Sequence, residues 1–391
     1  MKIPRWDKKN WFFLLVVFVL IFPKGGVKIA EVPLTWGYLL IGLTACGILL
    51  KKQWIISRNH LFILVTQIPF QLIALLHFQM QGVQDRGAFL AFLTHFFFFP
   101  IVFFALFSRS IETLDIRFFN TLLKRGISLV SIYGIVLFFF RIVVGKFLYV
   151  PLLTANLHDL NILELTKCIS RGNLFKLIST YNNGNIYGIC ILMILPYYQT
   201  IEQNRWKKRV VKLSLILTLS RTIWAGLLIE ELMTRFFIHP LTRQTVVNFL
   251  YRWGVFIGSI GIVLYYLNYD VSFAFDSTLG GRIRQFESIA DISWLGQFSF
   301  VAFEEIIYLS ILKNFGLLGL FSFILSMTIP LGIYLMTSKP SPDKKSLFSG
   351  LFLYLIMACS DGAILLIPVM AFYWFISGLL TSGLFHVSET A

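Results

Sequence analysis

Long apolar runs separated by short polar segments make up most of this chain, and they give the first indication of its structure. A run of roughly 20 apolar residues is long enough to cross a bilayer as a helix. The pattern therefore predicts about twelve membrane-spanning helices. They lie near residues 9–23, 33–50, 60–79, 88–107, 124–146, 185–200, 209–220, 222–235, 251–269, 306–336, 346–365 and 367–384.

The seventh and eighth runs are unusually short. Only the residues from Leu213 to Ser220 separate Lys212 from Arg221, too few to cross the hydrocarbon layer at about 1.5 Å per residue. The pattern predicts a short helix and then a reversal of the chain, which a membrane tolerates only where protein or a water-filled cavity surrounds it. We therefore expect Arg221 at the floor of an outward-facing hydrated pocket, as a functional residue. The alternative is a side chain that reaches a lipid headgroup.

Composition agrees with a membrane protein. Of the 391 residues, 57% are hydrophobic and only 14% are charged, and the mean hydropathy is +0.77. These values are typical of polytopic helical membrane proteins and not of soluble domains. The fold class we expect is all-α and integral to the membrane, with residues 1–391 forming a single polytopic domain.

The net charge of +15 informs topology. Basic residues gather in short segments at alternate ends of the apolar runs, such as Lys124 with Arg125 and Lys207 with Lys208. This is the pattern of cytoplasmic loops, so both termini are predicted to be cytoplasmic and nucleic acid is not expected as a partner. Residues 147–184 and 270–305 then become two larger outer loops. Long loops on one side of a membrane protein usually cover a site, although two independent solvent-exposed loops are the alternative.

The stretch Gly280–Gly319 concentrates polar residues ahead of a long apolar run. Arg282 and Arg284 come first, and Glu304 and Glu305 stand at the threshold of the run. A set of residues at helical spacing follows, and one continuous helix would carry them on one face. They are Glu305, Tyr308, Leu309, Leu312, Gly316 and Gly319. This resembles the wall of a site, but carboxylates are also common in the first turn of a helix, and Gly-x-x-Gly also serves close helix packing.

The first outer loop supplies further candidates for substrate binding. They are Arg171, Lys176, Tyr181, Asn182, Asn183 and Asn185. The two cations would add positive charge at the mouth of the site, although a surface helix with scattered basic residues explains them equally well. The tyrosine offers an aromatic ring to a bound substrate. The asparagines are predicted to form a turn and a helix cap, and Asn185 would also hydrogen-bond the substrate.

No metal site or cofactor is predicted. The four cysteines show no Cys-x-x-Cys spacing, and His158 and His239 are isolated. The chain carries no nucleotide-binding motif at a plausible place. We interpret Asp361, near the end of the eleventh run, as a structural partner.

Three pieces of the C-terminal half resemble the O-antigen ligase and polymerase superfamily, the WaaL and Wzy proteins. The pieces are Glu305 with Tyr308-Leu309 and Gly316…Gly319, then Ser220-Arg221-Thr222-Ile223-Trp224, and Tyr181-Asn182-Asn183-Gly184-Asn185. Each is short, and their order and topology make the match. Ligases of the superfamily usually have histidine where this chain has Glu305, so the resemblance favours the polymerase branch.

The resemblance implies a glycosyltransferase C-like fold in a bacterial inner membrane. It implies a polymerase that joins undecaprenyl-diphosphate-linked oligosaccharide repeat units on the outer face, with a chain-length regulator and a flippase as partners. Arg221 and Arg282, supported by Arg284, would hold the diphosphate. Glu305 would be the general base, with Tyr308 beside the substrate. The Tyr181 ring would stack on a sugar, and Asn185 would bond sugar hydroxyls. The alternatives are an O-antigen ligase and, from another class, a lipid-linked oligosaccharide flippase, although intramembrane charge is sparse here.

Overall fold

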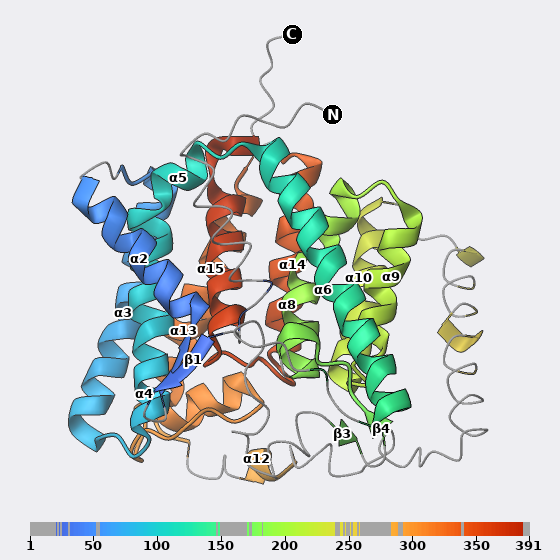
Figure 1. Ribbon diagram of the computed structural model, residues 1–391. Coiled ribbons are helices and arrows are strands. Elements are labelled where there is room, and N and C mark those ends of the chain that lie inside the picture. The colour runs from blue at the N-terminus through green and yellow to red at the C-terminus, as the bar shows by residue number, and fades with distance from the viewer. Residues whose placement is uncertain are drawn as a thin grey trace.

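The structure is a computed structural model. It describes residues 26–29, 32–51, 55–145, 170–171, 174–181, 183–238, 283–287, 292–337 and 340–385, together with a few isolated positions. This part of the chain is almost entirely helical, as predicted (Figure 1). Two short antiparallel strand pairs accompany the helices: β1 (Gly26–Ile29) with β2 (Val32–Thr35), and β3 (Ser170–Arg171) with β4 (Leu174–Phe175).

The α-helices run alternately up and down through the bundle in the view of Figure 1. They are α2 (Trp36–Lys51), α3 (Arg58–Gln81), α4 (Arg86–Leu93), α5 (Ser108–Glu112), α6 (Ile116–Val144), α8 (Gly184–Ile201), α9 (Arg205–Ile216), α10 (Arg221–Ile238), α12 (Ile283–Glu287), α13 (Ile307–Leu335), α14 (Pro342–Met357) and α15 (Ile367–Thr381). Two π-helical stretches, η2 (Thr94–Phe98) and η3 (Ile101–Leu106), continue α4, and 3₁₀ turns η5 (Ser179–Tyr181) and η7 (Gly383–Phe385) precede α8 and follow α15.

Four helical segments of the described part are long and apolar enough to cross a membrane. They are Arg58–Gln81, Arg86–Leu106, Ile116–Val144 and Ile307–Leu335. The protein is therefore membrane-associated by the character of its helices. Two shorter apolar helices, Leu39–Leu50 and Pro368–Thr381, accompany them. Most of the predicted spans at 9–23 and 251–269 lies outside the described residues, so twelve spans remain a prediction.

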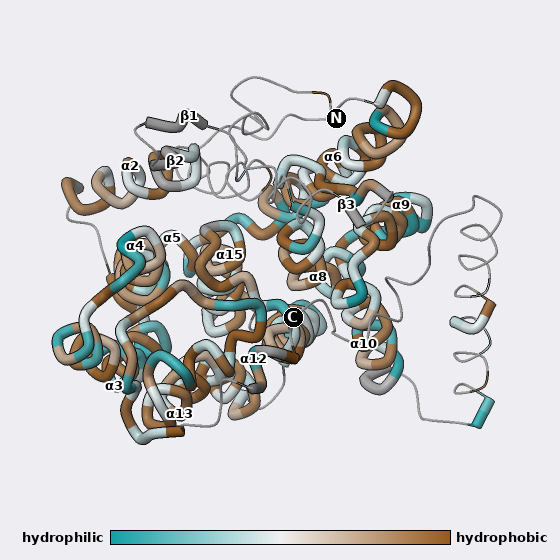
Figure 2. Tube along the Cα trace, turned by 90° about the horizontal axis from the view of Figure 1, so that it is seen from below, coloured by the Kyte–Doolittle hydropathy of each residue, from teal (hydrophilic) through white to brown (hydrophobic). Residues whose placement is uncertain are grey.

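The outer helices expose large apolar side chains where a soluble protein would carry polar ones. On α3, Leu61, Phe62 and Leu72 are each half exposed, and α6 shows the same from Leu129 onward. Apolar residues occur on every side of the bundle (Figure 2). Such a surface suits lipid, because hydrocarbon solvates it without the cost that water would impose.

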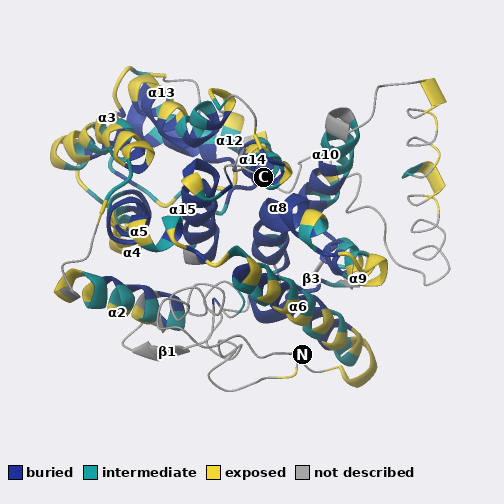
Figure 3. Ribbon diagram, turned by 90° about the horizontal axis from the view of Figure 1, so that it is seen from above, coloured by how far each residue is buried: buried dark blue, intermediate teal, exposed yellow. Residues whose placement is uncertain are grey.

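The centre of the bundle is formed by α8 and α15, which are buried almost throughout, together with α14, which is buried on the side that faces them (Figure 3). The contact between α8 and α14 is especially close. A Cβ atom at Gly350 would lie 1.9 Å from the carbonyl oxygen of Met193, so only glycine fits. A second core of interlocking aromatic rings joins α3, α4 and α13. Phe78, Phe92 and Phe315 meet there with ring centroids 5.3–5.8 Å apart.

The reversal predicted between the seventh and eighth runs is present. Helix α9 ends at Ile216, residues 217–220 turn the chain, and α10 begins at Arg221. Leu219 takes a left-handed conformation with φ of 50°. The indole nitrogen of Trp224 donates to the carbonyl of Ile216 at 2.9 Å, which ties α10 back onto the end of α9.

The expectation of one continuous helix from Glu305 to Gly319 was wrong. The chain is still extended at Ile306, and the helix is broken at Gly316, where φ is 71° and ψ is −169°. The first part of α13 lies across the lower end of the bundle before the second part rises through it (Figure 1). A Cβ atom at Gly316 would approach the carbonyl oxygen of Trp294 to 2.6 Å. Gly316 therefore serves as a corner, and Glu305 does not share a helical face with it.

Candidate functional site

The segment before α8 lies deep inside the bundle. The Ser179 hydroxyl donates to the carbonyl of Val130 at 2.7 Å, and Leu177 packs on Gly134, where an added Cβ would lie 2.8 Å from its side chain. Helix α6 continues from Gly134 to Val144, about 15 Å further at 1.5 Å per residue. The start of α8 is therefore recessed by about that depth from the lower end of α6.

Helix α8 begins with the asparagine cap that the sequence predicts. Asn183 Oδ1 accepts from the backbone nitrogens of Asn185 and Ile186 at 2.9 and 3.4 Å, which satisfies two amides at the helix start. Gly184 permits a close approach, because a Cβ there would lie 2.7 Å from the carbonyl oxygen of Leu177. The cap fixes the first turn and so directs the Asn185 side chain.

Asn185 reaches across to the segment that joins α14 to α15, residues 358–366, called here the α14–α15 connection. Its Nδ2 donates to Asp361 Oδ2 at 2.7 Å, over a sequence separation of 176 residues. Asp361 is only 7% exposed. Asn185 Oδ1 is also buried, and it has no hydrogen-bond partner among the described residues. A buried carboxylate thus receives an amide donor, while an amide oxygen beside it remains available.

Arg221 arrives at the same place from α10. It is the first residue of that helix and is partly buried. The next residue, Thr222, shares a hydrogen bond of 3.1 Å with Ser360, which precedes Asp361. The reversal itself is bound to the segment before α8, because the Leu177 nitrogen donates to the Leu217 carbonyl at 2.9 Å. Arg221 is next to Thr222 in the sequence and Asp361 is next to Ser360, so each charged residue is one position away from this hydrogen bond.

Glu305 meets the α14–α15 connection through its backbone. The nitrogen of Gly362 donates to the carbonyl of Glu305 at 3.2 Å, and the nitrogen of Ile307 donates to the carbonyl of Ala358 at 3.2 Å. These two bonds fix the chain on either side of Glu305. The Glu305 side chain is exposed, so its carboxylate belongs to the rim of the site while that of Asp361 belongs to the interior.

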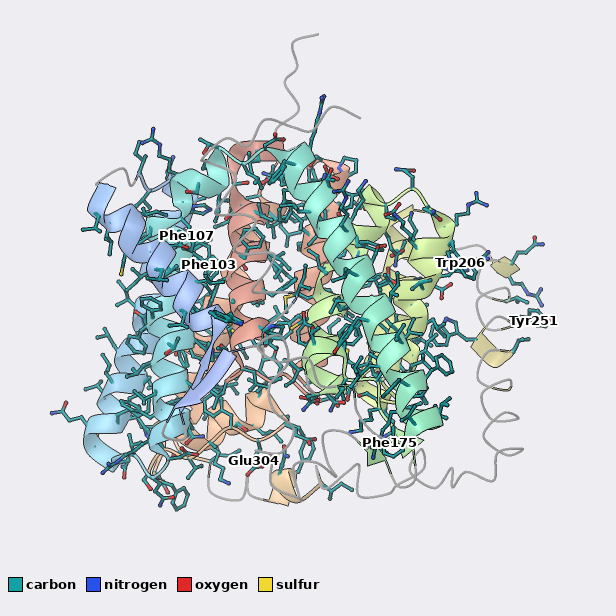
Figure 4. All side chains as sticks on the ribbon, in the orientation of Figure 1. Phe103, Phe107, Phe175, Trp206, Tyr251 and Glu304 are labelled. Carbon is teal, nitrogen blue, oxygen red and sulfur yellow. The ribbon has the colours of Figure 1, made fainter. Side chains whose placement is uncertain are left out.

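Glu304 has a different environment. Its carboxylate is exposed on the lower side of the bundle, near α12 (Figure 4), and pairs with Lys313 at 3.3 Å. Its backbone nitrogen donates to the Ser310 hydroxyl at 2.9 Å, which caps the entry to α13. The two neighbouring carboxylates are therefore in different surroundings.

The α14–α15 connection thus contacts three separate segments: the start of α8, the start of α10 and the residues before α13. They carry Asn185, Arg221 and Glu305, one from each piece of the resemblance. A fixed arginine suits a phosphate group, because its planar guanidinium matches two oxygens at once. Carboxylates can accept a proton from a hydroxyl or bond to it. Charged groups at this depth are costly, and in membrane proteins they usually mark a functional site.

Several other candidates lie elsewhere or in the core. Tyr181 is 1% exposed, and its ring packs edge-on against Tyr187 at 5.5 Å, so stacking on a sugar is not supported. The Tyr308 hydroxyl donates to the Leu355 carbonyl at 2.8 Å and holds α13 against α14. Lys176 is 5% exposed, and its Cβ lies 3.4 Å from the position of a Cβ at Gly184, at the recessed start of α8.

Four predicted residues are not placed by their side chains. Arg171 lies in β3 and Arg284 lies in α12, but only their backbone is described. Arg282 and Asn182 lie outside the described residues. In the part of the chain that the structure does describe, no group of three or more histidine, cysteine or acidic side chains is arranged to hold a metal ion.

The interpretation of Asp361 as a structural partner agrees with its hydrogen bond from Asn185, but its place where the three segments meet was not predicted. An aspartate near the end of a long apolar run is as unusual as Arg221, and this signal was present in the sequence. Ser360 and Thr222 were not predicted as part of the site. The comparison of this chain with protein-family models and with curated proteins finds no match.

Proposed function

We propose that this protein is a polysaccharide polymerase. It would join oligosaccharide repeat units carried on undecaprenyl diphosphate, by glycosyl transfer on the outer face of a bacterial inner membrane. The single observation that carries the proposal is the meeting, at the α14–α15 connection, of the three segments that carry Asn185, Arg221 and Glu305. Each comes from a different piece of the resemblance, and the chain separates them by 36 and then 84 positions.

The proposed chemistry needs one proton acceptor and one cationic site. Glu305 takes the proton from a hydroxyl of the acceptor repeat unit, and that oxygen forms a bond to the anomeric carbon of the donor. The bond between this carbon and the diphosphate oxygen breaks, and the electron pair leaves with the diphosphate. Arg221 stabilises the departing charge, as fixed cationic donors do for phosphate leaving groups. Arg282 is proposed as a second cation at the diphosphate.

The recessed position favours this assignment. A lipid-linked substrate is anchored in the bilayer by its polyprenyl chain, so its diphosphate could enter a site that is recessed into the bundle from the lower end of α6. Basic residues mark the opposite end of the bundle. Arg58, Arg109, Arg117, Arg205, Lys344 and Lys345 are all at the upper ends of their helices in Figure 1. We propose that this end is cytoplasmic, which makes the recessed site open outward.

An O-antigen ligase is the nearest alternative activity. It would use the same cation to hold the same donor, but transfer the glycan to lipid A-core. Glu305 in place of histidine favours the polymerase, in line with the resemblance. A flippase is less favoured, because charged residues within the apolar runs are sparse.

Deletion of the gene, followed by gel electrophoresis of the surface polysaccharide, tests the proposal. A polymerase defect abolishes the ladder of long chains but leaves lipid A-core bearing a single repeat unit. Loss of all capped lipid would indicate a ligase instead. Accumulation of lipid-linked repeat units on the inner leaflet would indicate a flippase. Complementation by the wild-type gene, but not by an Arg221→Lys variant, would connect the phenotype to the site.

A further inference from the structure

Helix α6 carries an outward stripe that changes character part-way along. Arg117, Thr121 and Arg125 are exposed at its upper end and follow one another at four-residue intervals. The same stripe continues through Leu129 and Ile132, which are 55% and 52% exposed. Residues at such spacing lie on one face of a helix, so this face is basic above Arg125 and apolar below it.

Helix α9 repeats the change beside it. Arg205, Trp206 and Arg209 are exposed in its first turns, and Leu213, four residues later, is 44% exposed. The two helices pack against each other and lie side by side at the edge of the bundle (Figures 2 and 3). Neither contains an acidic residue within its bounds. Two neighbouring helices thus present cations and then apolar side chains to the same surroundings.

The change from basic to apolar exposed residues occurs at the same height on α6 and on α9. The Tyr187 hydroxyl of α8 is hydrogen-bonded to Ser131 of α6 at 3.0 Å and to Ser214 of α9 at 2.6 Å, so these serines share a level. Both helices descend from the upper end of the bundle (Figure 1). Arg125 precedes Ser131 by six residues and Arg209 precedes Ser214 by five, which puts them about 9 Å and about 7.5 Å above that level.

This height matches the boundary of a bilayer. From Arg125 to the last residue of α6, Val144, the helix rises by about 28 Å, close to the thickness of the hydrocarbon core of roughly 30 Å. If the apolar stripe lies in hydrocarbon, both arginines are at the phosphate level of the upper leaflet. Trp206, 68% exposed and at the edge of the bundle in Figure 4, has the interfacial position that tryptophan favours.

We propose that the adjoining outer faces of α6 and α9 bind an anionic membrane phospholipid. Arg125 and Arg209 contact its phosphate, Trp206 lies beside its headgroup, and Leu129 and Leu213 contact its acyl chains. The charge of the face selects anionic over zwitterionic lipid, because a face without acidic residues gains from additional negative charge. This inference does not depend on the proposed polymerase activity.

Native mass spectrometry of the detergent-purified full chain, titrated with phosphatidylglycerol or phosphatidylcholine, tests the proposal. We expect tighter retention of phosphatidylglycerol. Each cation near an anionic surface is worth about a fivefold gain, so Arg125→Gln with Arg209→Gln should weaken phosphatidylglycerol binding about 25-fold. The corresponding double lysine variant, which keeps both charges, should retain most of it.

The matched control removes two exposed arginines at the same end of the bundle but on other helices, Arg58→Gln with Arg109→Gln. It should leave the tight phosphatidylglycerol binding within about twofold. An equal loss in both double variants would refute a located site and leave only general charge attraction. Equal binding of the two lipids would refute the selectivity. A stable dimer that dissociates only in the Arg125/Arg209 variant would show that a second copy of the chain, and not lipid, covers this face.

Discussion

Replacement of Asn185 by aspartate tests the contact on which the site is built. The amide donates to Asp361 at 2.7 Å, and Asp361 is 7% exposed. Asn185→Asp exchanges this attraction for two carboxylates at nearly the same separation. At an effective dielectric constant of about 20, two unit charges at that distance repel by about 6 kcal/mol. Uptake of one proton limits the penalty, because holding an ordinary carboxyl group neutral at pH 7 costs about 4 kcal/mol.

We therefore expect Asn185→Asp to destabilise the folded protein by up to about 4 kcal/mol at pH 7. The exchange variant Asn185→Asp with Asp361→Asn should recover most of this loss, because it restores one carboxylate and one amide with their positions reversed. Thermal unfolding of the detergent-purified proteins measures both effects. The matched control is Asn183→Asp, two residues away, where aspartate caps the helix as well as asparagine does and the change should be nearly neutral.

Two results would refute this reasoning. Wild-type stability in Asn185→Asp would mean that the 2.7 Å contact does not hold the two segments together. An exchange variant no more stable than Asn185→Asp would mean that the loss comes from elsewhere. If the exchange variant folds well, its activity adds a separate result, because it shows whether the carboxylate must be on α8 or on the α14–α15 connection.

Three further predictions concern the remaining parts of the site. Under the proposed activity, Arg221→Lys should lower polymerisation about 10- to 100-fold with normal membrane insertion, because lysine keeps the charge but cannot offer paired donors; an unchanged ladder in a complementation assay would contradict this. Glu305→Gln should lower the rate of polymerisation by roughly 10²–10⁴-fold as the loss of a general base, whereas Glu304→Gln removes only an exposed pair with Lys313 and should be mild. Equal effects of the two glutamine variants on polymer yield would argue against Glu305 as the base. Gly316→Ala should lower the thermal stability by at least about 1–3 kcal/mol, because it combines a left-handed conformation with a 2.6 Å approach to the Trp294 carbonyl; Gly332→Ala, where nothing lies within 4 Å, is the control and should be neutral or stabilising.

Many of the helices could be predicted from the sequence, because a segment that crosses lipid must be a long run of apolar residues. Apolar runs of sufficient length gave the positions of α3 and α8 to within a few residues, and the asparagine cap of α8 was evident from Asn183. Helix α6 ends near the predicted residue but begins at Ile116, ahead of the predicted start at residue 124. The reversal before Arg221 was also predictable, because basic residues on both sides restrict the topology. These are local properties, and each is written in adjacent residues.

The break at Gly316 and the pairing with Asp361 could not be predicted in the same way. The residues from Glu305 to Gly319 keep a helical spacing in the sequence even though Gly316 has a positive φ. The order of residue types does not reveal the backbone conformation of each residue. The contact between Asn185 and Asp361 depends on how α8 and α14 pack, and that packing depends on the fit of Gly350 against Met193. Tyr181 had the polar surroundings of a surface residue in the sequence, but the fold buries its ring against Tyr187.

The recessed meeting point of the segments also has an electrostatic character that owes nothing to side chains. Helices α8, α10 and α13 begin there and α14 ends there. Each helix start has the equivalent of about half a positive charge and each helix end about half a negative one, so the backbone alone supplies about one positive charge at this place. Peptide dipoles do not titrate. The attraction for an anion therefore persists at any pH at which the bundle is folded, and no side-chain substitution removes it completely.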